Sequence, residues 1–269
     1  MQLPIGVFDS GVGGLTVLRA LRAALPGEQF VYLGDTARLP YGTKSGETVT
    51  RYAEQAARVL VARGIKLLVV ACNTASAVGL GHLAAVFAPL PVIGVIEPGA
   101  EAACAASASG QIAVIATEGT VRGGAYERAI RALRPDATVI SAPCQLFVAL
   151  AEEGWVRGPI AEAIARRYLE GLVTEHPALD CLVLGCTHFP VLREAIAAAV
   201  GPRVALVDSA ETTARAVAGC LARTGLRAPA GAGGGAKFLA TDAPARFARV
   251  GAVFLGEAIA PEGVELVDL

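Results

Sequence analysis

Two cysteines stand at matching places in the sequence. Each follows a short apolar run and precedes hydroxyl or amide side chains: VVACNTAS contains Cys72, and LVLGCTHF contains Cys186. Where a strand ends and a helix begins, unpaired backbone N–H groups and the helix dipole favour negative charge. We therefore expect both thiols to have a lowered pKa, and the thiolate is the reactive form.

Two thiols from opposed halves of a protein suit one type of reaction. One group removes a proton from a carbon atom, and the other returns a proton to the opposite face. The reference pKa of cysteine, about 8.5, is close enough to neutrality to be tuned either way. Asp9, at the end of the first apolar run, and His188, two residues past Cys186, are candidates to assist. For either cysteine alone, burial in the core would explain the pattern as well, but the matched copy favours chemistry.

Small polar residues follow several predicted strands. Asn73 and Thr74 follow the first cysteine, and Thr187 follows the second, so these side chains could hold a carboxylate in the same crevice. Thr117 and Thr120 follow a third strand and are either helix caps or ligand contacts.

Two turns contain glycines at strand ends. In GDTARLPYG, Pro40 and Gly42 fix the backbone path, so that exposed N–H groups could bind a carboxylate; an ordinary surface loop is the alternative. FDSGVGG lacks the GK[ST] of a P-loop and the spacing GxGxxG, so a small anionic or zwitterionic ligand fits better than a nucleotide. Asp9 within this turn could also be a plain helix cap.

Short β-like runs alternate with helical patterns along most of the chain. Val/Ile/Leu-rich strands between helices indicate an α/β fold with mainly parallel sheets covered on both faces, and ligands are expected at the strand ends. A helix is predicted over residues 45–64, with Ser45 as its cap and Gly64 as its stop. Strands are predicted at residues 5–9, 29–34, 66–71, 92–96, 111–117, 138–142, 180–185 and 203–209.

The sequence also repeats itself in part. IKLLVVACNTASAV (65–78) aligns with LDCLVLGCTHFPVL (179–192), and VFDSG (7–11) is echoed by LVDSA (206–210). These matches predict two α/β halves related by pseudosymmetry. GLRAPAGAGGGAK (225–237) is predicted to be a linker or flexible loop, followed by a further strand and helix.

Composition argues against several classes of protein. The 269 residues suit one large domain or two smaller ones, and a net charge of −1 without a basic block argues against nucleic acid or an anionic membrane as the main partner. No apolar run reaches the roughly 18 residues of a membrane span, and the N-terminus lacks the features of a signal peptide. We therefore expect a cytoplasmic protein with free thiols.

Metal and cofactor sites are not predicted. The six cysteines include no CxxC pair, which argues against a thiol redox protein, and with only three histidines there is no zinc-type spacing. None of the three lysines lies beside a phosphate loop, as a pyridoxal phosphate enzyme would require.

Four motifs in this order resemble the glutamate racemases of the cofactor-independent aspartate/glutamate racemase superfamily: FDSGVGGLTVL, YLGDTARLPYG, VVACNTASA and LGCTHFP. The resemblance extends from Ile5 to about Gly256. It implies two pseudosymmetric α/β domains with the active site in the crevice between them. We expect residues 1–96 plus 209–269 to form the first domain and residues 97–208 the second. It also implies a homodimer that interconverts L- and D-glutamate without a cofactor and supplies D-glutamate for peptidoglycan.

The resemblance assigns roles to individual residues. Cys72 matches the thiol that acts on D-glutamate and Cys186 the one that acts on L-glutamate, assisted by Asp9 and His188, with Glu152 as a supporting carboxylate. The residues expected to bind the substrate are Ser10, Pro40, Tyr41, Gly42, Asn73, Thr74, Thr117, Thr120 and Thr187.

One segment departs from the family pattern. CQLFVALAEE has Gln145 and Ala149 where family members usually have prolines, which leaves a choice between Glu152 and Glu153; spacing favours Glu152. The nearest alternative function is a racemase of the same superfamily that acts on aspartate or another acidic substrate. A non-catalytic binding or regulatory protein is an alternative of another class.

Overall fold

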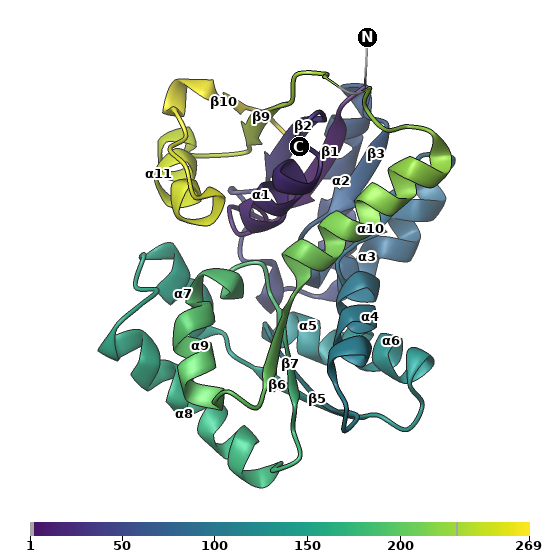
Figure 1. Ribbon diagram of the computed structural model, residues 1–269. Coiled ribbons are helices and arrows are strands. Elements are labelled where there is room, and N and C mark those ends of the chain that lie inside the picture. Colours follow the sequence, from purple (N-terminus) through teal and green to yellow (C-terminus); the bar gives the residue numbers. More distant parts are fainter. Residues whose placement is uncertain (1–2, 230) are drawn as a thin grey trace.

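The computed structural model describes residues 3–229 and 231–269 and contains two parallel β-sheets (Figure 1). This confirms the predicted α/β class. One sheet has the order β10-β9-β2-β1-β3-β4 and the other β6-β5-β7-β8. The first sheet contains β1 (Ile5–Asp9), β2 (Gln29–Gly34), β3 (Leu67–Val70), β4 (Val92–Gly94), β9 (Gly235–Ala240) and β10 (Val264–Leu266). The second contains β5 (Gln111–Ala116), β6 (Thr138–Pro143), β7 (Cys181–Gly185) and β8 (Ala205–Asp208).

Most strands lie where the apolar runs predicted them, within one or two residues. β1, β3 and β7 are buried along their whole length, as expected for parallel strands covered on both faces. Of the predicted strand 92–96, β4 covers residues up to Gly94, because a helix begins at Ile96. β9 begins at Gly235, inside the segment predicted to be a linker, and β10 was not predicted.

Helices connect the strands. α2 (Gly46–Ala62) begins as predicted after Ser45, whose hydroxyl accepts a hydrogen bond from the Thr48 N–H at 3.3 Å. Gly64, just past its end, has a φ of 72°, which suits glycine. The others are α1 (Leu15–Ala24), α3 (Asn73–Val86), α4 (Ile96–Ala106), α5 (Glu118–Gly123), α6 (Ala125–Leu133), α7 (Leu146–Glu152), α8 (Pro159–Glu175), α9 (Arg193–Val200), α10 (Ser209–Thr224) and α11 (Pro244–Leu255). Short 3₁₀ helices are η1 (Tyr41–Thr43), η2 (Phe189–Leu192) and η3 (Pro261–Gly263).

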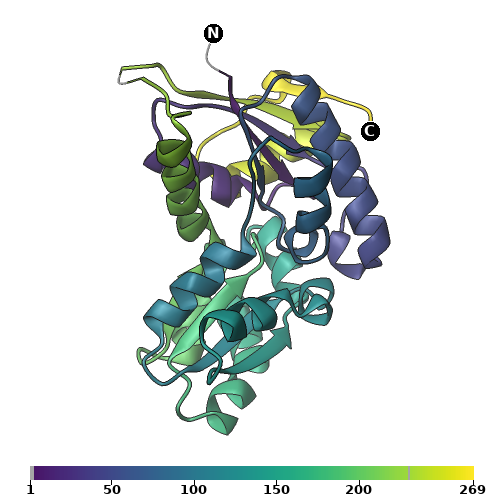
Figure 2. The same ribbon diagram turned by 90° about the vertical axis from the view of Figure 1, so that its right-hand side faces the viewer.

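The two sheets form an upper and a lower half of the molecule (Figure 1). In the upper half, α10 and α2 lie on opposite sides of the sheet (Figure 2), and both the first strand, β1, and the last, β10, belong to this sheet. α10 packs against α1 and α4, so it links the halves where the chain returns from β8. Among the described residues, every helix is too short or too polar to cross a membrane.

The two halves share one strand order, which is the basis of the pseudosymmetry. The sequence β2-β1-β3-β4 in the upper sheet corresponds to β6-β5-β7-β8 in the lower one. Cys72 follows the third strand of the upper half and Cys186 the third strand of the lower half, so the cysteine repeat reflects the symmetry.

The repeat of VFDSG in LVDSA does not reflect this symmetry. Asp9 ends β1, the first strand of its half, whereas Asp208 ends β8, the fourth strand of the other. Asp208 caps α10 by accepting hydrogen bonds from Ala210 N at 2.9 Å and Glu211 N at 3.2 Å. The interpretation of these two motifs as equivalent was therefore wrong, because a helix cap and a strand-end carboxylate have the same short sequence signature.

A buried ion pair closes the upper half at the amino ends of its strands. Lys66 Nζ lies 2.5 Å from Glu28 Oε2, and the two side chains are 5% and 1% exposed. Lys66 also donates to the Leu226 carbonyl at 2.7 Å, and Glu28 accepts from Ala228 N at 2.7 Å. The pair thus fixes the segment after α10 against the sheet.

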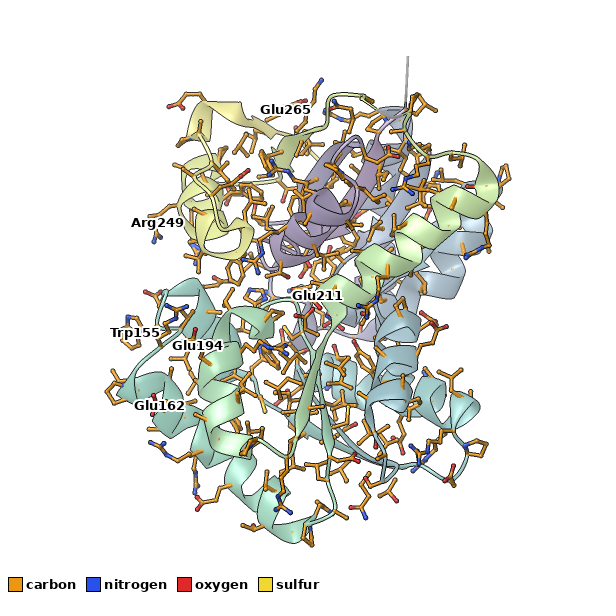
Figure 3. The ribbon with its side chains drawn as sticks, in the orientation of Figure 1. Trp155, Glu162, Glu194, Glu211, Arg249 and Glu265 are labelled. Carbon is orange, nitrogen blue, oxygen red and sulfur yellow. The ribbon has the colours of Figure 1, made fainter. Side chains whose placement is uncertain are left out.

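Lys66→Met should destabilise the fold by about 3–5 kcal/mol, because it leaves the Glu28 carboxylate buried without its ion-pair partner. The measurement is urea unfolding followed by circular dichroism. Arg63→Met is the control, because it breaks the exposed ion pair of Arg63 with Glu265. Glu265 lies on the outer surface of the upper half (Figure 3). Such an exposed pair should contribute no more than about 1 kcal/mol to stability. Equal losses in both variants would contradict the prediction.

Candidate active site

One pocket lies where the carboxyl ends of the two sheets meet. Ser10 follows β1 and Cys72 follows β3 in the upper half, while Thr117 follows β5 and Cys186 follows β7 in the lower half. Both thiols therefore face one space from opposite halves. The lining residues are Ser10, Gly11, Leu39, Pro40, Tyr41, Gly42, Cys72, Asn73, Thr74, Thr117, Thr120, Gln145, Val148, Glu152, Cys186, Thr187 and His188.

Every site residue predicted from the sequence, except Asp9, is among these lining residues. Glu152 lines the pocket, whereas Glu153 is exposed to solvent. Four lining residues were not predicted: Gly11, Leu39, Gln145 and Val148. Gln145 and Val148 belong to the segment CQLFVALAEE, whose departure from the family pattern was the available signal.

Cys72 is the N-cap residue of α3 and is 5% exposed. Its thiol donates to Ser10 Oγ at 3.4 Å, and its sulfur accepts from Ala75 N at 3.5 Å. Burial, reinforced by the charge of Asp9, raises the pKa of the Cys72 thiol to about 12. The expectation of a lowered pKa was therefore wrong for Cys72, because loss of solvent outweighs the helix N-terminus.

Asp9 lies behind the lining residues and is fully buried. Its Oδ2 accepts from Gly11 N at 2.9 Å, while its Oδ1 has no hydrogen-bond partner within the described ranges. Burial raises the pKa of Asp9, although the nearby His188 opposes this shift. The N-cap position of α1 belongs to Gly14, so a simple capping role does not account for this carboxylate.

Cys186 lies in a different local structure from Cys72. The chain passes from β7 through Thr187 and His188 into the 3₁₀ helix η2, and an α-helix begins only at Arg193. The predicted direct passage from this cysteine into a helix was therefore wrong. Instead, Cys186 Sγ lies 3.8 Å from Nδ1 of His188.

A chain of polar contacts extends from this imidazole. Nε2 of His188 lies 3.2 Å from Glu152 Oε1, and Glu152 Oε2 accepts from Arg246 of α11 at 3.0 Å. Burial by itself lowers the pKa of His188, but its contacts with Cys186 and Glu152 and the charge of Asp9 raise the pKa to about 10. The contact with His188 lowers the pKa of Glu152. The imidazole is therefore positively charged near neutral pH.

Glycine is required beside this imidazole. A Cβ at Gly13, between β1 and α1, would lie 2.4 Å from Nδ1 of His188. The glycine-rich turn therefore lets the upper half approach the lower half closely.

Three threonine hydroxyls meet across the two halves. Thr74 of α3 lies 3.1 Å from Thr117 and 3.1 Å from Thr120, which are themselves 3.1 Å apart. The Thr117 hydroxyl makes no capping bond to α5, so the capping alternative does not hold for it. Gly42 packs against Thr117, where a Cβ would lie 2.8 Å from the threonine Cβ. The segment around Gly42 is thus part of the pocket wall.

Residues 5–217 match the Asp/Glu/Hydantoin racemase family. The chain belongs to this family. Within the described residues, no group of three or more His, Cys, Asp or Glu side chains is arranged to hold a metal ion.

Members of the Asp/Glu/Hydantoin racemase family match the chain over nearly its whole length. A glutamate racemase of Geobacter metallireducens is 54% identical, covering 94% of this chain and 92% of that protein. The structure of glutamate racemase from Francisella tularensis in complex with D-glutamate has a TM-score of 0.91 at 36% identity, covering 99% of this chain and 98% of the other. The Thermus thermophilus glutamate racemase in complex with β-chloro-D-alanine has a TM-score of 0.89 at 46% identity, covering 100% and 98%.

Asp9→Asn should make the Cys72 thiol more reactive. Removing the negative charge lowers the pKa of this thiol, so the thiolate fraction at about pH 8 rises several-fold. Iodoacetamide labelling followed by peptide mass spectrometry reports each cysteine separately. Cys104, whose pKa is shifted by burial and not by Asp9, is the internal control. Unchanged or slower labelling of Cys72 would contradict the prediction.

Glu152→Gln should lower the pKa of His188 and change how stability depends on pH. Because the pKa of His188 is about 10 when folded and about 6.5 when unfolded, its contribution is complete below about pH 6.5 and is lost as pH rises through about 10. The variant should lose stability less steeply over this range. NMR titration of the three histidines and urea unfolding at several pH values measure both effects. An unchanged His188 titration would contradict the role of Glu152.

Proposed function

We propose that this protein is a glutamate racemase that interconverts L- and D-glutamate through two thiols and without a cofactor. The observation that carries the proposal is the presence of Cys72 and Cys186, from equivalent strands of two halves, in one pocket. The relatives named above support glutamate as the substrate, and one of their structures is a complex with D-glutamate.

The proton transfers follow from the positions of the thiols. In the L-to-D direction, the Cys186 thiolate takes the α-proton and the Cys72 thiol delivers a proton to the opposite face. This turnover leaves Cys186 as a thiol and Cys72 as a thiolate, which is the state that acts on D-glutamate. His188 beside Cys186 and Asp9 near Cys72 are the groups that restore the starting protonation.

Burial helps the abstraction step. A thiol with a raised pKa gives a stronger base once it is deprotonated, and the α-proton of an amino acid is only weakly acidic. The carbanion that forms spreads its charge onto the adjacent carboxylate, which needs hydrogen-bond donors in a dry site. We assign this binding of the amino and α-carboxylate groups to Ser10, Asn73, Thr74, Thr120 and Thr187, with Thr117 completing the threonine cluster.

We assign the side-chain carboxylate of glutamate to the loop after β2. Pro40, Tyr41 and Gly42 of this loop line the pocket, and backbone N–H groups there can bind an anion. Tyr41 is held in place by its hydroxyl, which donates to the buried Asp35 carboxylate at 2.5 Å. Aspartate is one methylene shorter than glutamate, so we expect it to bind this loop less well while its α-carbon lies between the thiols.

We also propose the wider setting of the enzyme. The first domain consists of residues 1–96 plus 209–269 and the second of residues 97–208, a division supported by the membership of the two sheets. The protein works as a homodimer in the cytoplasm, with free thiols, and supplies D-glutamate for peptidoglycan.

In D₂O, the reduced protein should racemise L-glutamate with no added cofactor and replace its α-proton by deuterium. Optical rotation and the α-proton NMR signal measure the two events together. L-aspartate, run in parallel, should keep both its rotation and its α-proton. Reaction of aspartate alone would overturn the assignment of substrate. If neither amino acid exchanged its α-proton, a binding protein would be favoured.

Cys72→Ala and Cys186→Ala should each abolish racemisation, because each variant lacks one of the two thiols that transfer the proton. Near-normal turnover in either variant would overturn the two-base mechanism.

A further inference from the structure

Asn73 lines the pocket and has one amide atom without a hydrogen-bond partner in the described part of the chain. This residue follows Cys72, begins α3 and is 3% exposed. Its Oδ1 accepts a hydrogen bond from the Tyr126 hydroxyl at 2.7 Å, whereas its Nδ2 is buried and has no partner among residues 3–229 and 231–269. A side-chain amide whose oxygen is occupied on one side can only offer N–H donors on the other.

Tyr126 is held rigidly outside the pocket. It belongs to α6 of the lower half and is 2% exposed. Its ring fills a slot between Gly99 of α4 and Gly185 of β7, where an added Cβ would lie 3.0 Å and 3.1 Å from ring carbons. Gly185 directly precedes Cys186. A ring fixed beside one thiol therefore holds a residue that directly follows the other thiol.

The Tyr126 phenol keeps the proton that this hydrogen bond needs. Burial raises the pKa of Tyr126, and the negative groups nearby, Cys186 first among them, raise it further. The hydroxyl therefore keeps its proton, and because its partner at 2.7 Å is an amide oxygen, which only accepts, the hydroxyl is the donor.

We propose that Tyr126 is a positioning residue that orients the Asn73 amide, so that Nδ2 donates to a carboxylate of the substrate. A carboxylate only accepts hydrogen bonds and an ammonium group only donates them. The orientation of this amide therefore selects whether a carboxylate or the ammonium group of an amino acid lies beside Asn73, next to Cys72. This inference rests on the proposed function, because it takes glutamate as the ligand.

The first test removes only the hydroxyl. Tyr126→Phe keeps the ring in its slot but frees the amide to rotate, so kcat/KM for glutamate should fall about tenfold, chiefly through KM. Tyr52→Phe is the matched control, since it also removes a phenol hydroxyl, but one that makes no hydrogen bond to a lining residue within the described part of the chain. This control should stay within about twofold of wild type. A Tyr126→Phe variant equally close to wild type would overturn the proposal.

A double-mutant cycle separates orientation from general packing. The dissociation constant for DL-glutamate, measured by calorimetry, is accessible even in variants that do not turn over. In an Asn73→Ala background, adding Tyr126→Phe should change this constant by no more than about twofold, because no amide remains to be oriented. A tenfold loss in both backgrounds would mean that the tyrosine acts through the fold alone.

Asn73→Asp tests the polarity of the amide without altering Tyr126. The aspartate still accepts from the Tyr126 hydroxyl but turns an oxygen toward the pocket, so glutamate should bind at least about tenfold more weakly. Unchanged or tighter binding would show that an acceptor belongs at this point and would overturn the proposal. A wild-type protein that does not racemise glutamate overturns the proposed function instead, independently of these binding comparisons.

Discussion

The site depends on one constraint, the meeting of two parallel sheets at their carboxyl ends. Parallel strands place every strand-to-helix turn at the same edge, so each half presents its polar turns together. When two such edges face each other, equivalent turns lie on opposite sides of one space. Cys72 and Cys186 occupy equivalent third strands, so a carbon atom bound between them can be reached from both faces.

The halves match in backbone but differ in electrostatics. Cys72 lies near the buried carboxylate of Asp9, while Cys186 lies beside an imidazole whose pKa is raised to about 10. Enantiomers have equal free energies in water, so this difference cannot favour one product at equilibrium. The difference between the halves can only change the relative heights of the activation barriers of the two proton transfers. A racemase therefore needs no chemical symmetry, only two groups that each reach a reactive protonation state.

The sequence predicted those features that depend on local pattern. Buried strands, the Ser45 cap and both cysteines follow from apolar runs and turn residues, and they lie where expected. The sequence pattern did not predict the features that depend on tertiary packing. The pKa of Cys72 depends on how completely the folded chain buries this thiol, and the short edge strand β10 pairs with β9, which is distant from the other strands in the sequence. Nothing in the sequence pattern indicated a role for Tyr126, because its hydrogen-bond partner, Asn73, is 53 residues away and belongs to the other half.

Several hydrogen bonds that join the halves near the pocket involve residues beside the thiols. Thr74 meets Thr117 and Thr120, the Thr16 hydroxyl donates to the Thr187 carbonyl at 3.0 Å, and Tyr126 donates to Asn73. Apolar surfaces tolerate small sliding motions, whereas hydrogen bonds lose strength steeply with distance and angle. Directional bonds therefore help to fix the spacing of the two thiols. The same hydroxyls and amides that would hold a substrate also define how far apart its two bases lie.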